Sequence, residues 1–232
     1  MTAREIKVED LVIALINTQE NSAFTLSERE GLCDDAVSLY ANVNDDVPYA
    51  ISIHNTNVIT YYAVGVFCDG VNTKNTADVL SDTNPSLNDL YSVYPDRTVR
   101  VLGFDDGSEF VREFLVSGEL RRSKAKEHGF EGRMGYIDIV VYQIDVDFTP
   151  EEAQQLKALY KKYNDCDDDN DEKKPFVGLM CVTTEGRRMK VTKEKATQNL
   201  LTAYERICIS AISEARFTLE FKKKLEIKLR QE

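Results

Sequence analysis

The chain has 232 residues, of which 42% are hydrophobic and 30% are charged, a composition typical of a folded globular protein. Its formal net charge of −11 at pH 7 argues against nucleic acids and anionic membranes as partners, because both attract a surplus of Lys and Arg. No apolar run approaches the roughly 18 residues that span a bilayer, and the amino terminus lacks an apolar signal segment. We therefore expect a protein of the cytoplasm or of a virion.

The cysteines indicate a reducing environment. Their number, five, is odd, and no Cys-x-x-Cys pair occurs. Reduced thiols that serve as small core residues are therefore favoured over disulfides. The cysteines are Cys33, Cys68, Cys166, Cys181 and Cys208.

Residues 1–46 are predicted to be a helical extension. Apolar residues in the segment 5–18 recur at helical spacing and form one stripe. Ser27 and Glu30 form a capping-box pattern, which predicts a second amphipathic helix over residues 27–42. The apolar residues of the first stripe are Val8, Leu11, Val12, Leu15 and Ile16.

The two apolar stripes must be buried, either against the rest of the chain or against another subunit. They precede a stretch that is already a complete sandwich in pattern, so we favour a subunit contact. The alternative, in which the helices cover one face of the sheet, stays open. The predicted partner-binding residues are Leu11, Leu15, Leu32 and Tyr40.

Residues 47–232 are predicted to be a β-sandwich domain with helical insertions. Short apolar strands separated by polar turns are typical of an antiparallel sandwich. The overall fold class is therefore mainly β within the α+β class, with two amino-terminal helices and one or two further helices. The central strands are expected at residues 49–55, 60–68, 91–95, 98–104, 109–114 and 135–142.

The last third of the chain contains further helices and strands. Thr149 followed by Pro150 is a strong helix start, and the helix is expected to end near Tyr163. A buried strand follows at residues 175–183, and a helix at residues 192–206. The alternating tail, 217–229, favours a terminal hairpin or two edge strands over one long helix, because its lysines suit an exposed edge.

Several short motifs in the central stretch resemble an uncharacterised β-sandwich domain family found in bacteria and in large DNA viruses of protists. The resemblance implies a sandwich, and it carries no assigned activity and no catalytic residues. Cys68, Lys124 and Asp138 depart from the family pattern. The similar residues are Ile53, Asn55, Asp69–Asn72, Tyr91, Pro95, Val101–Phe104, Val111–Phe114, Ser123–Ala125 and Gly135–Ile137.

An acidic run after the Thr149 helix is the sharpest candidate for a metal site. Asp165, Asp167, Asp169 and Asp171 fall at positions 1, 3, 5 and 7 of a calcium loop. The position of the closing bidentate Glu is occupied by Phe176, however. A solvated acidic loop is therefore favoured, and weak Ca²⁺ binding is the alternative; no other cofactor is expected.

No catalytic constellation emerges from the rest of the sequence. His54 and His128 are the only histidines, and no ligand spacing accompanies them. Glycine-rich phosphate loops are also missing from the sequence. We expect a non-enzymatic structural protein that associates with itself or with other subunits in a virion or an ordered intracellular lattice. The alternative is a module that binds a cation or a sugar, through the acidic run or the polar loop 71–88.

Overall fold

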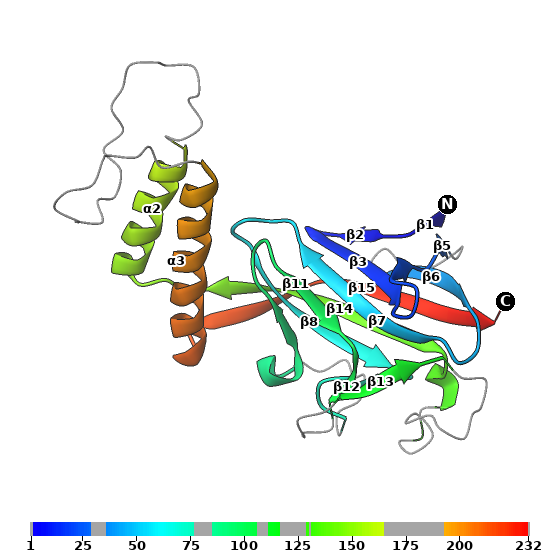
Figure 1. Ribbon diagram of the computed structural model, residues 1–232. Coiled ribbons are helices and arrows are strands. Elements are labelled where there is room, and N and C mark those ends of the chain that lie inside the picture. Colours follow the sequence, from blue (N-terminus) through cyan, green and yellow to red (C-terminus); the bar gives the residue numbers. More distant parts are fainter. Residues whose placement is uncertain are drawn as a thin grey trace. The chain divides into compact units, whose positions relative to one another are not determined.

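The computed structural model describes residues 2–28, 36–76, 85–105, 111–116, 129, 131–164 and 193–231. The chain divides into two compact units. The first unit, Met1–Asp145 with Leu219–Glu232, is a β-sandwich, and the described part of the second, Val146–Thr218, contains a pair of helices (Figure 1). The helical unit is thus an insertion in the sandwich sequence.

One sheet of the sandwich has eight strands among the described residues, in the order β1-β5-β6-β15-β14-β8-β10, with β9 paired to β8. Strand β15 pairs in parallel with β6, and its other neighbour is β14. The strands are β1 (Thr2–Ala3), β5 (Leu26–Glu28), β6 (Ala36–Val43), β8 (Tyr61–Cys68), β9 (Val71–Asn72), β10 (Tyr91–Val93), β14 (Tyr136–Val146) and β15 (Phe217–Gln231).

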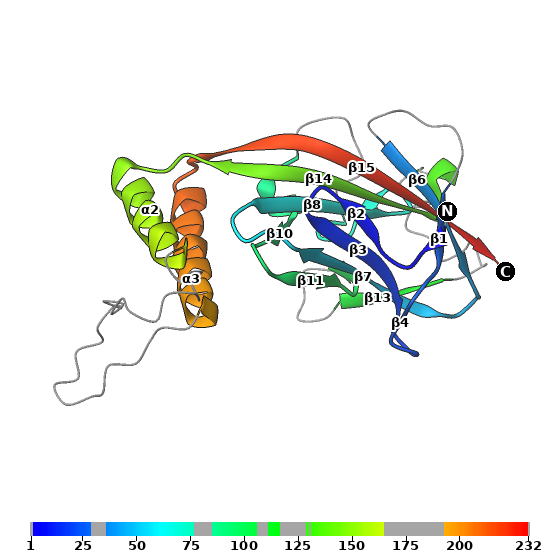
Figure 2. The same ribbon diagram turned by 90° about the horizontal axis from the view of Figure 1, so that it is seen from above.

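The second sheet has seven strands within the described ranges, in the order β12-β13-β7-β3-β2, with β11 paired to β7 and β4 to β3. All of its pairings are antiparallel. Figure 2 shows the two sheets as separate layers. The strands are β2 (Ile6–Val8), β3 (Leu11–Asn17), β4 (Ser22–Ala23), β7 (Pro48–Asn55), β11 (Thr98–Val101), β12 (Gly103–Asp105) and β13 (Val111–Leu115).

The core lies between the layers and is built from alternate residues of each strand. Leu11, Ile13 and Leu15 of β3 are at most 1% exposed, and alternate residues of β7, β8 and β14 meet them in one cluster. Each fully buried side chain of this size stabilises the fold by roughly 1.5–3 kcal/mol. Strand β8 is buried along its whole length, which explains why its sequence is apolar at successive positions.

The two predicted amino-terminal helices are wrong, because this part of the chain forms strands of both sheets. Leu11 and Leu15 are four residues apart, so they lie on the same face of a helix and also on the same face of a strand. The apolar pattern therefore fits both structures. β-Branched residues of β3 such as Val12 and Ile16 favour the strand. Residues 36–42, assigned to the second helix, lie in β6, and residues 29–35 lie outside the described part.

The central strands agree with their predictions, except that the predicted strand 98–104 divides into β11 and β12 and that residues 109–110 lie outside the described part. The tail differs. Its alternating residues form the single strand β15, which lies inside the sheet between β6 and β14 rather than at an edge. Its lysines are placed by ion pairs: Lys222 with Glu220 at 2.7 Å and Lys224 with Asp138 at 3.1 Å. The predicted strand at 175–183 lies outside the described residues. Two short 3₁₀ turns, Leu87–Asp89 and Glu131–Arg133, complete the sandwich unit.

The inserted unit contains α2 (Pro150–Asn164) and α3 (Lys193–Ser213). The first helix begins at the predicted start, and a capping box forms there: Thr149 Oγ1 accepts from the Glu152 backbone amide at 3.3 Å, and the Glu152 carboxylate accepts from the Thr149 backbone amide at 2.8 Å. Leu156 packs against residues of α3, including the buried Cys208. No helix in the described part of the chain combines the length and apolar character needed to cross a membrane.

Candidate functional site

The candidate site is a pocket where the chain crosses twice between the two sheets. The first crossing runs from β4 through Phe24 and Thr25 into β5, and the second runs from β6 through residues 44–47 into β7. The pocket has a volume of about 540 Å³ and is open to solvent. That volume falls within the roughly 300–1,000 Å³ typical of small-molecule sites. We call it the crossover pocket.

Amides and hydroxyls dominate the lining of the crossover pocket, together with one carboxylate and one aromatic ring. Among the described residues, the lining contains no lysine, arginine, histidine or cysteine. These side chains therefore offer hydrogen bonds and a small apolar surface, with one negative charge on Glu20. The lining residues are Thr2, Asn17, Gln19, Glu20, Ser22, Ala23, Phe24, Thr25, Ser27, Asn42, Val43, Asn44 and Val47.

Asn17 fixes the shape of the turn that forms one wall. Its side-chain oxygen accepts hydrogen bonds from the backbone amides of Gln19 at 3.0 Å and Glu20 at 3.2 Å, the geometry by which Asn caps a turn. The next residue, Asn21, has a positive φ of 50°, which Asn tolerates better than most residues. Ser22 then donates to a carboxylate oxygen of Glu20 at 3.2 Å. The turn thereby holds the one acidic group of the pocket in place.

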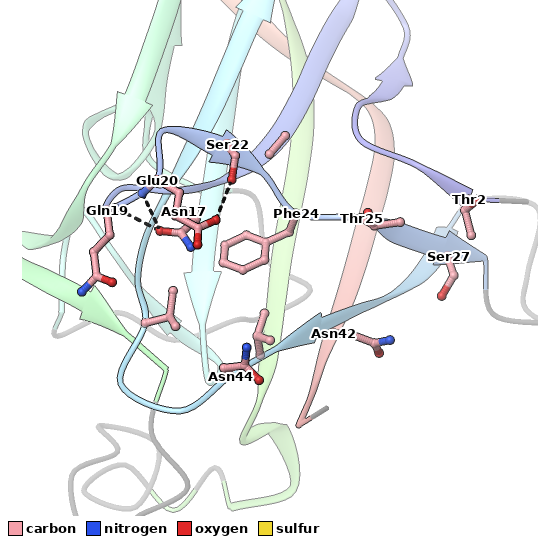
Figure 3. Close-up of a pocket in the computed structure, with 13 residues that line it drawn as sticks. Thr2, Asn17, Gln19, Glu20, Ser22, Phe24, Thr25, Ser27, Asn42 and Asn44 are labelled. Atoms are coloured by element: carbon pink, nitrogen blue, oxygen red, sulfur yellow. Dashed lines mark hydrogen bonds between the residues drawn. The ribbon is translucent and has the colours of Figure 1, made fainter.

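Several polar side chains of the pocket are available to a ligand. The side-chain amides of Gln19, Asn42 and Asn44 and the hydroxyl of Thr25 form no hydrogen bond with any other residue that the structure describes. Figure 3 shows the Phe24 ring in the middle of the group, with Asn17 and Glu20 on one side and Asn44 on the other. Phe24 is partly buried and also packs on the core cluster. An apolar surface is thus surrounded by open donors and acceptors.

The sequence prediction missed this pocket because most of residues 17–24 fall between the two helices that it expected. The signal was nevertheless present: Asn17 to Ser22 is a run of amide, hydroxyl and carboxylate side chains between two apolar segments. Such a run in a loop is typical of a binding surface. Asn42 and Asn44 could not be added to it, because only the pairing of the strands brings them near.

The predicted partner-binding residues lie in different environments in the structure. Leu11 and Leu15 are 0% and 1% exposed and belong to the sandwich core, so neither offers surface to a partner. Tyr40 lies on β6, where the Arg230 guanidinium is 3.1 Å from its ring centroid. Leu32 lies outside the described residues.

The predicted calcium ligands, Asp165, Asp167, Asp169 and Asp171, also lie outside the described residues. Within the described ranges, no three His, Cys, Asp or Glu side chains converge as a metal site. The described part of the polar loop 71–88 is bonded internally. Asn72 and Thr73 are fully buried there, and Asn72 accepts from the Lys74 amide at 2.9 Å. These two residues therefore support the sheet.

The described thiols and imidazole are not arranged for nucleophilic catalysis. Burial raises the pKa of the Cys68 thiol well above its ordinary value and that of Cys208 to about 11, so both thiols stay protonated at neutral pH. Cys68 accepts a hydrogen bond from the Tyr49 hydroxyl at 3.8 Å. His54 pairs with Thr98 at 3.0 Å. These groups are explained by packing and strand pairing.

Comparison with protein-family models, with curated proteins and with solved structures finds no match to this chain. The resemblance of the central stretch to a bacterial and viral sandwich family therefore stays a prediction. Assignment of a function rests on the two-sheet sandwich and on the chemistry of the crossover pocket.

Proposed function

We propose that the protein is a non-catalytic β-sandwich module that binds a small, uncharged, hydroxyl-rich ligand of the sugar class in the crossover pocket. The observation that carries the proposal is the group of unbonded amides and hydroxyls around the Phe24 ring. The proposed activity is recognition, and it requires no chemical step.

The match between pocket and ligand is one of hydrogen-bond chemistry. A sugar hydroxyl both donates and accepts, and the amides of Gln19, Asn42 and Asn44 do the same. A sugar ring also has an apolar face of C–H groups, for which the Phe24 ring provides a complementary surface. The carboxylate of Glu20 can accept from two adjacent hydroxyls, and it disfavours an anionic ligand.

The expected affinity is low. A polar ligand of drug-like efficiency gains about −0.3 kcal/mol per heavy atom. For a monosaccharide of roughly 12 heavy atoms this corresponds to a Kd of a few millimolar. Oligosaccharides that contact more of the crossover turns are expected to bind more tightly.

The test is a titration of isotope-labelled protein with a panel of neutral mono- and oligosaccharides, followed by NMR. Amide shifts are expected in residues 17–27 and 42–47. The variant Asn44→Ala removes one open amide from the pocket and is expected to weaken binding about five- to tenfold, the effect of one lost hydrogen bond of about 1 kcal/mol. Asn88→Ala removes an exposed amide from the 3₁₀ turn Leu87–Asp89 and is the matched control. Shifts confined to other regions, or equal binding by both variants, would refute the proposal.

A second candidate function is assembly with further copies of the chain, as part of a virion or an intracellular lattice. Leu102, Val111 and Leu115 are 44–53% exposed and surround β12, the terminal strand of the seven-stranded order. Apolar residues at an exposed sheet edge favour strand pairing between molecules.

The assembly candidate is tested by light scattering over a concentration series. Val111→Lys is expected to lower the average mass if the edge joins two copies, because a lysine opposes edge pairing. Ile59→Lys, at a similarly exposed residue away from this edge, is the control. A mass equal to one chain at every concentration would eliminate this candidate.

A further inference from the structure

The outer face of β15 has a row of charged side chains. Leu225 and Ile227 point into the core and are fully buried. The alternate residues of the strand therefore point outward, and they are Lys224, Glu226, Lys228 and Arg230. The neighbouring strands add aromatic rings from Tyr40 of β6 and Tyr136 of β14.

Half of this charge is neutralised within the sheet. Asp138 of β14 is 0% exposed and forms ion pairs with Arg133 and with Lys224, the latter at 3.1 Å. Arg133 also donates to Glu226 at 2.9 Å. Two cations and two carboxylates thus form one ion-pair network, and the burial of Asp138 explains why the cations lie there.

Lys228 and Arg230 are not explained in this way. Neither forms an ion pair with any carboxylate of the described residues. Each is held instead against an aromatic ring: Lys228 Nζ lies 5.0 Å from the Tyr136 centroid, and the Arg230 guanidinium lies 3.1 Å from that of Tyr40. Contacts of this kind orient a cation and leave its N–H groups free.

Lys228 and Arg230 are alternate residues of β15, so their Cα atoms are roughly 6.5–7 Å apart and both side chains leave the same face of the sheet. Lys228 contacts a ring of β14, and Arg230 contacts a ring of β6. The protein has a formal net charge of −11, yet no carboxylate of the described residues pairs with either cation. We propose that Lys228 and Arg230, with Tyr40 and Tyr136, form a docking strip for an acidic segment of another protein.

The spacing of the strip specifies the form of the segment. An extended peptide presents alternate side chains at the same spacing as β15 does. Two carboxylates at positions i and i+2 therefore face Lys228 and Arg230 together. The planar guanidinium of Arg230, already fixed on Tyr40, is suited to bidentate contact with one carboxylate.

An acidic peptide fits the strip better than a nucleic acid. A nucleic acid gains affinity in proportion to the number of phosphates neutralised, and the strip offers two unpaired cations in an acidic molecule. A short segment with two carboxylates needs only two cations to pair with. The strip and the crossover pocket adjoin where Asn42 lies opposite Arg230, so the two sites are tested with separate ligands and separate variants.

The probe is a fluorescein-labelled peptide of alternating Glu and Ser, and a Gln–Ser peptide serves as the uncharged reference. Anisotropy at low ionic strength is expected to show binding of the acidic peptide alone, weakening as salt is added. The double variant Lys228→Gln/Arg230→Gln is expected to lower the association constant about fivefold or more, from two exposed charge contacts. Arg230→Lys keeps the positive charge but loses the planar guanidinium that can contact a carboxylate through two N–H groups. Its association constant is expected to lie between those of the unchanged protein and the double variant.

The matched control is Arg4→Gln/Lys7→Gln, which changes the net charge equally at two exposed residues near β2. It is expected to bind the peptide as the unchanged protein does. An equal loss in both double variants would show that only overall charge matters and would overturn the proposal. Failure to bind the acidic peptide would also overturn it. Tighter binding of a single-stranded oligonucleotide, lost in the same variant, would reassign the strip to nucleic acid.

Discussion

The buried carboxylate of Asp138 predicts that substitutions of its cationic partner and of Asp138 itself will destabilise the protein by different amounts. Its side chain is 0% exposed, whereas Arg133 and Lys224 keep 25% and 30% of their side-chain surface in contact with solvent. Burial opposes the charge of Arg133, but its hydrogen bonds to Asp138 and Glu226 raise its pKa above the ordinary value. The network therefore depends on the cations remaining beside the buried anion.

Removing the arginine is expected to cost more than removing the aspartate. Arg133→Met leaves Asp138 buried with Lys224 alone, and a broken buried ion pair costs about 3–5 kcal/mol. We expect about 3 kcal/mol, since Lys224 still compensates part of the charge. Asp138→Asn leaves two cations that can be hydrated, so its cost is expected to be about 1 kcal/mol. The double variant is expected to be less destabilised than Arg133→Met alone.

Urea unfolding followed by circular dichroism measures these differences. Tyrosine emission gives a second signal, because the chain has 11 Tyr and no Trp. For a chain of this size, about 3 kcal/mol corresponds to a fall in Tm of roughly 6–12 °C. The reasoning is refuted if Asp138→Asn is as destabilising as Arg133→Met, or if the costs of the two single changes add in the double variant.

Three further predictions concern packing, thiol reactivity and pH. Gly103→Ala is expected to destabilise the protein by about 3 kcal/mol or more in thermal unfolding, because its Cβ would overlap the carbonyl oxygen of Arg112. Cys68, whose pKa is raised by burial, is expected to resist iodoacetamide until the protein unfolds, as read by peptide mass mapping. Hydrogen bonding from Arg216 lowers the pKa of Glu152 in the folded protein. The ionised Glu152 carboxylate therefore stabilises the fold at pH values above the ordinary pKa of glutamate. This stabilisation is lost as the pH falls through the lowered pKa of the folded state. Glu152→Gln is expected to flatten that acid dependence.

Each of these predictions has a control in the same chain. Gly132→Ala places a Cβ in open space and is expected to leave Tm nearly unchanged. Glu151→Gln, in the same first turn of α2, is expected to preserve the acid dependence. Rapid labelling of Cys68 in the folded protein would contradict its burial in the core.

The sequence predicted those parts of the fold whose signal is local. The strands over residues 49–68 and the capping box at Thr149 follow from residues that are near neighbours in the chain. The first strands could not be separated from helices in this way. What selects a strand for Leu11–Asn17 is its pairing with Tyr49–Asn55, a contact between distant segments.

The same reason explains the parts of the candidate site that were not predicted. Parallel pairing places Arg230 opposite Asn42, and neither residue has a local signal for the other. Asn17 and Phe24 lie in one sequence segment, yet they form a pocket with Asn44 only after two crossings between sheets. Local patterns therefore indicate the components of the site, and long-range pairing determines their combination.

The position of β15 has a consequence for biosynthesis. Its two neighbours, β6 and β14, are made before the helical insertion, and β15 is made after it. While the ribosome synthesises residues 146–218, the eight-stranded sheet lacks its central strand, and two edges stay unpaired. Unpaired edges of this kind invite association between nascent chains. Closure of the sheet must therefore await the synthesis of β15, so the sandwich is expected to complete its folding late.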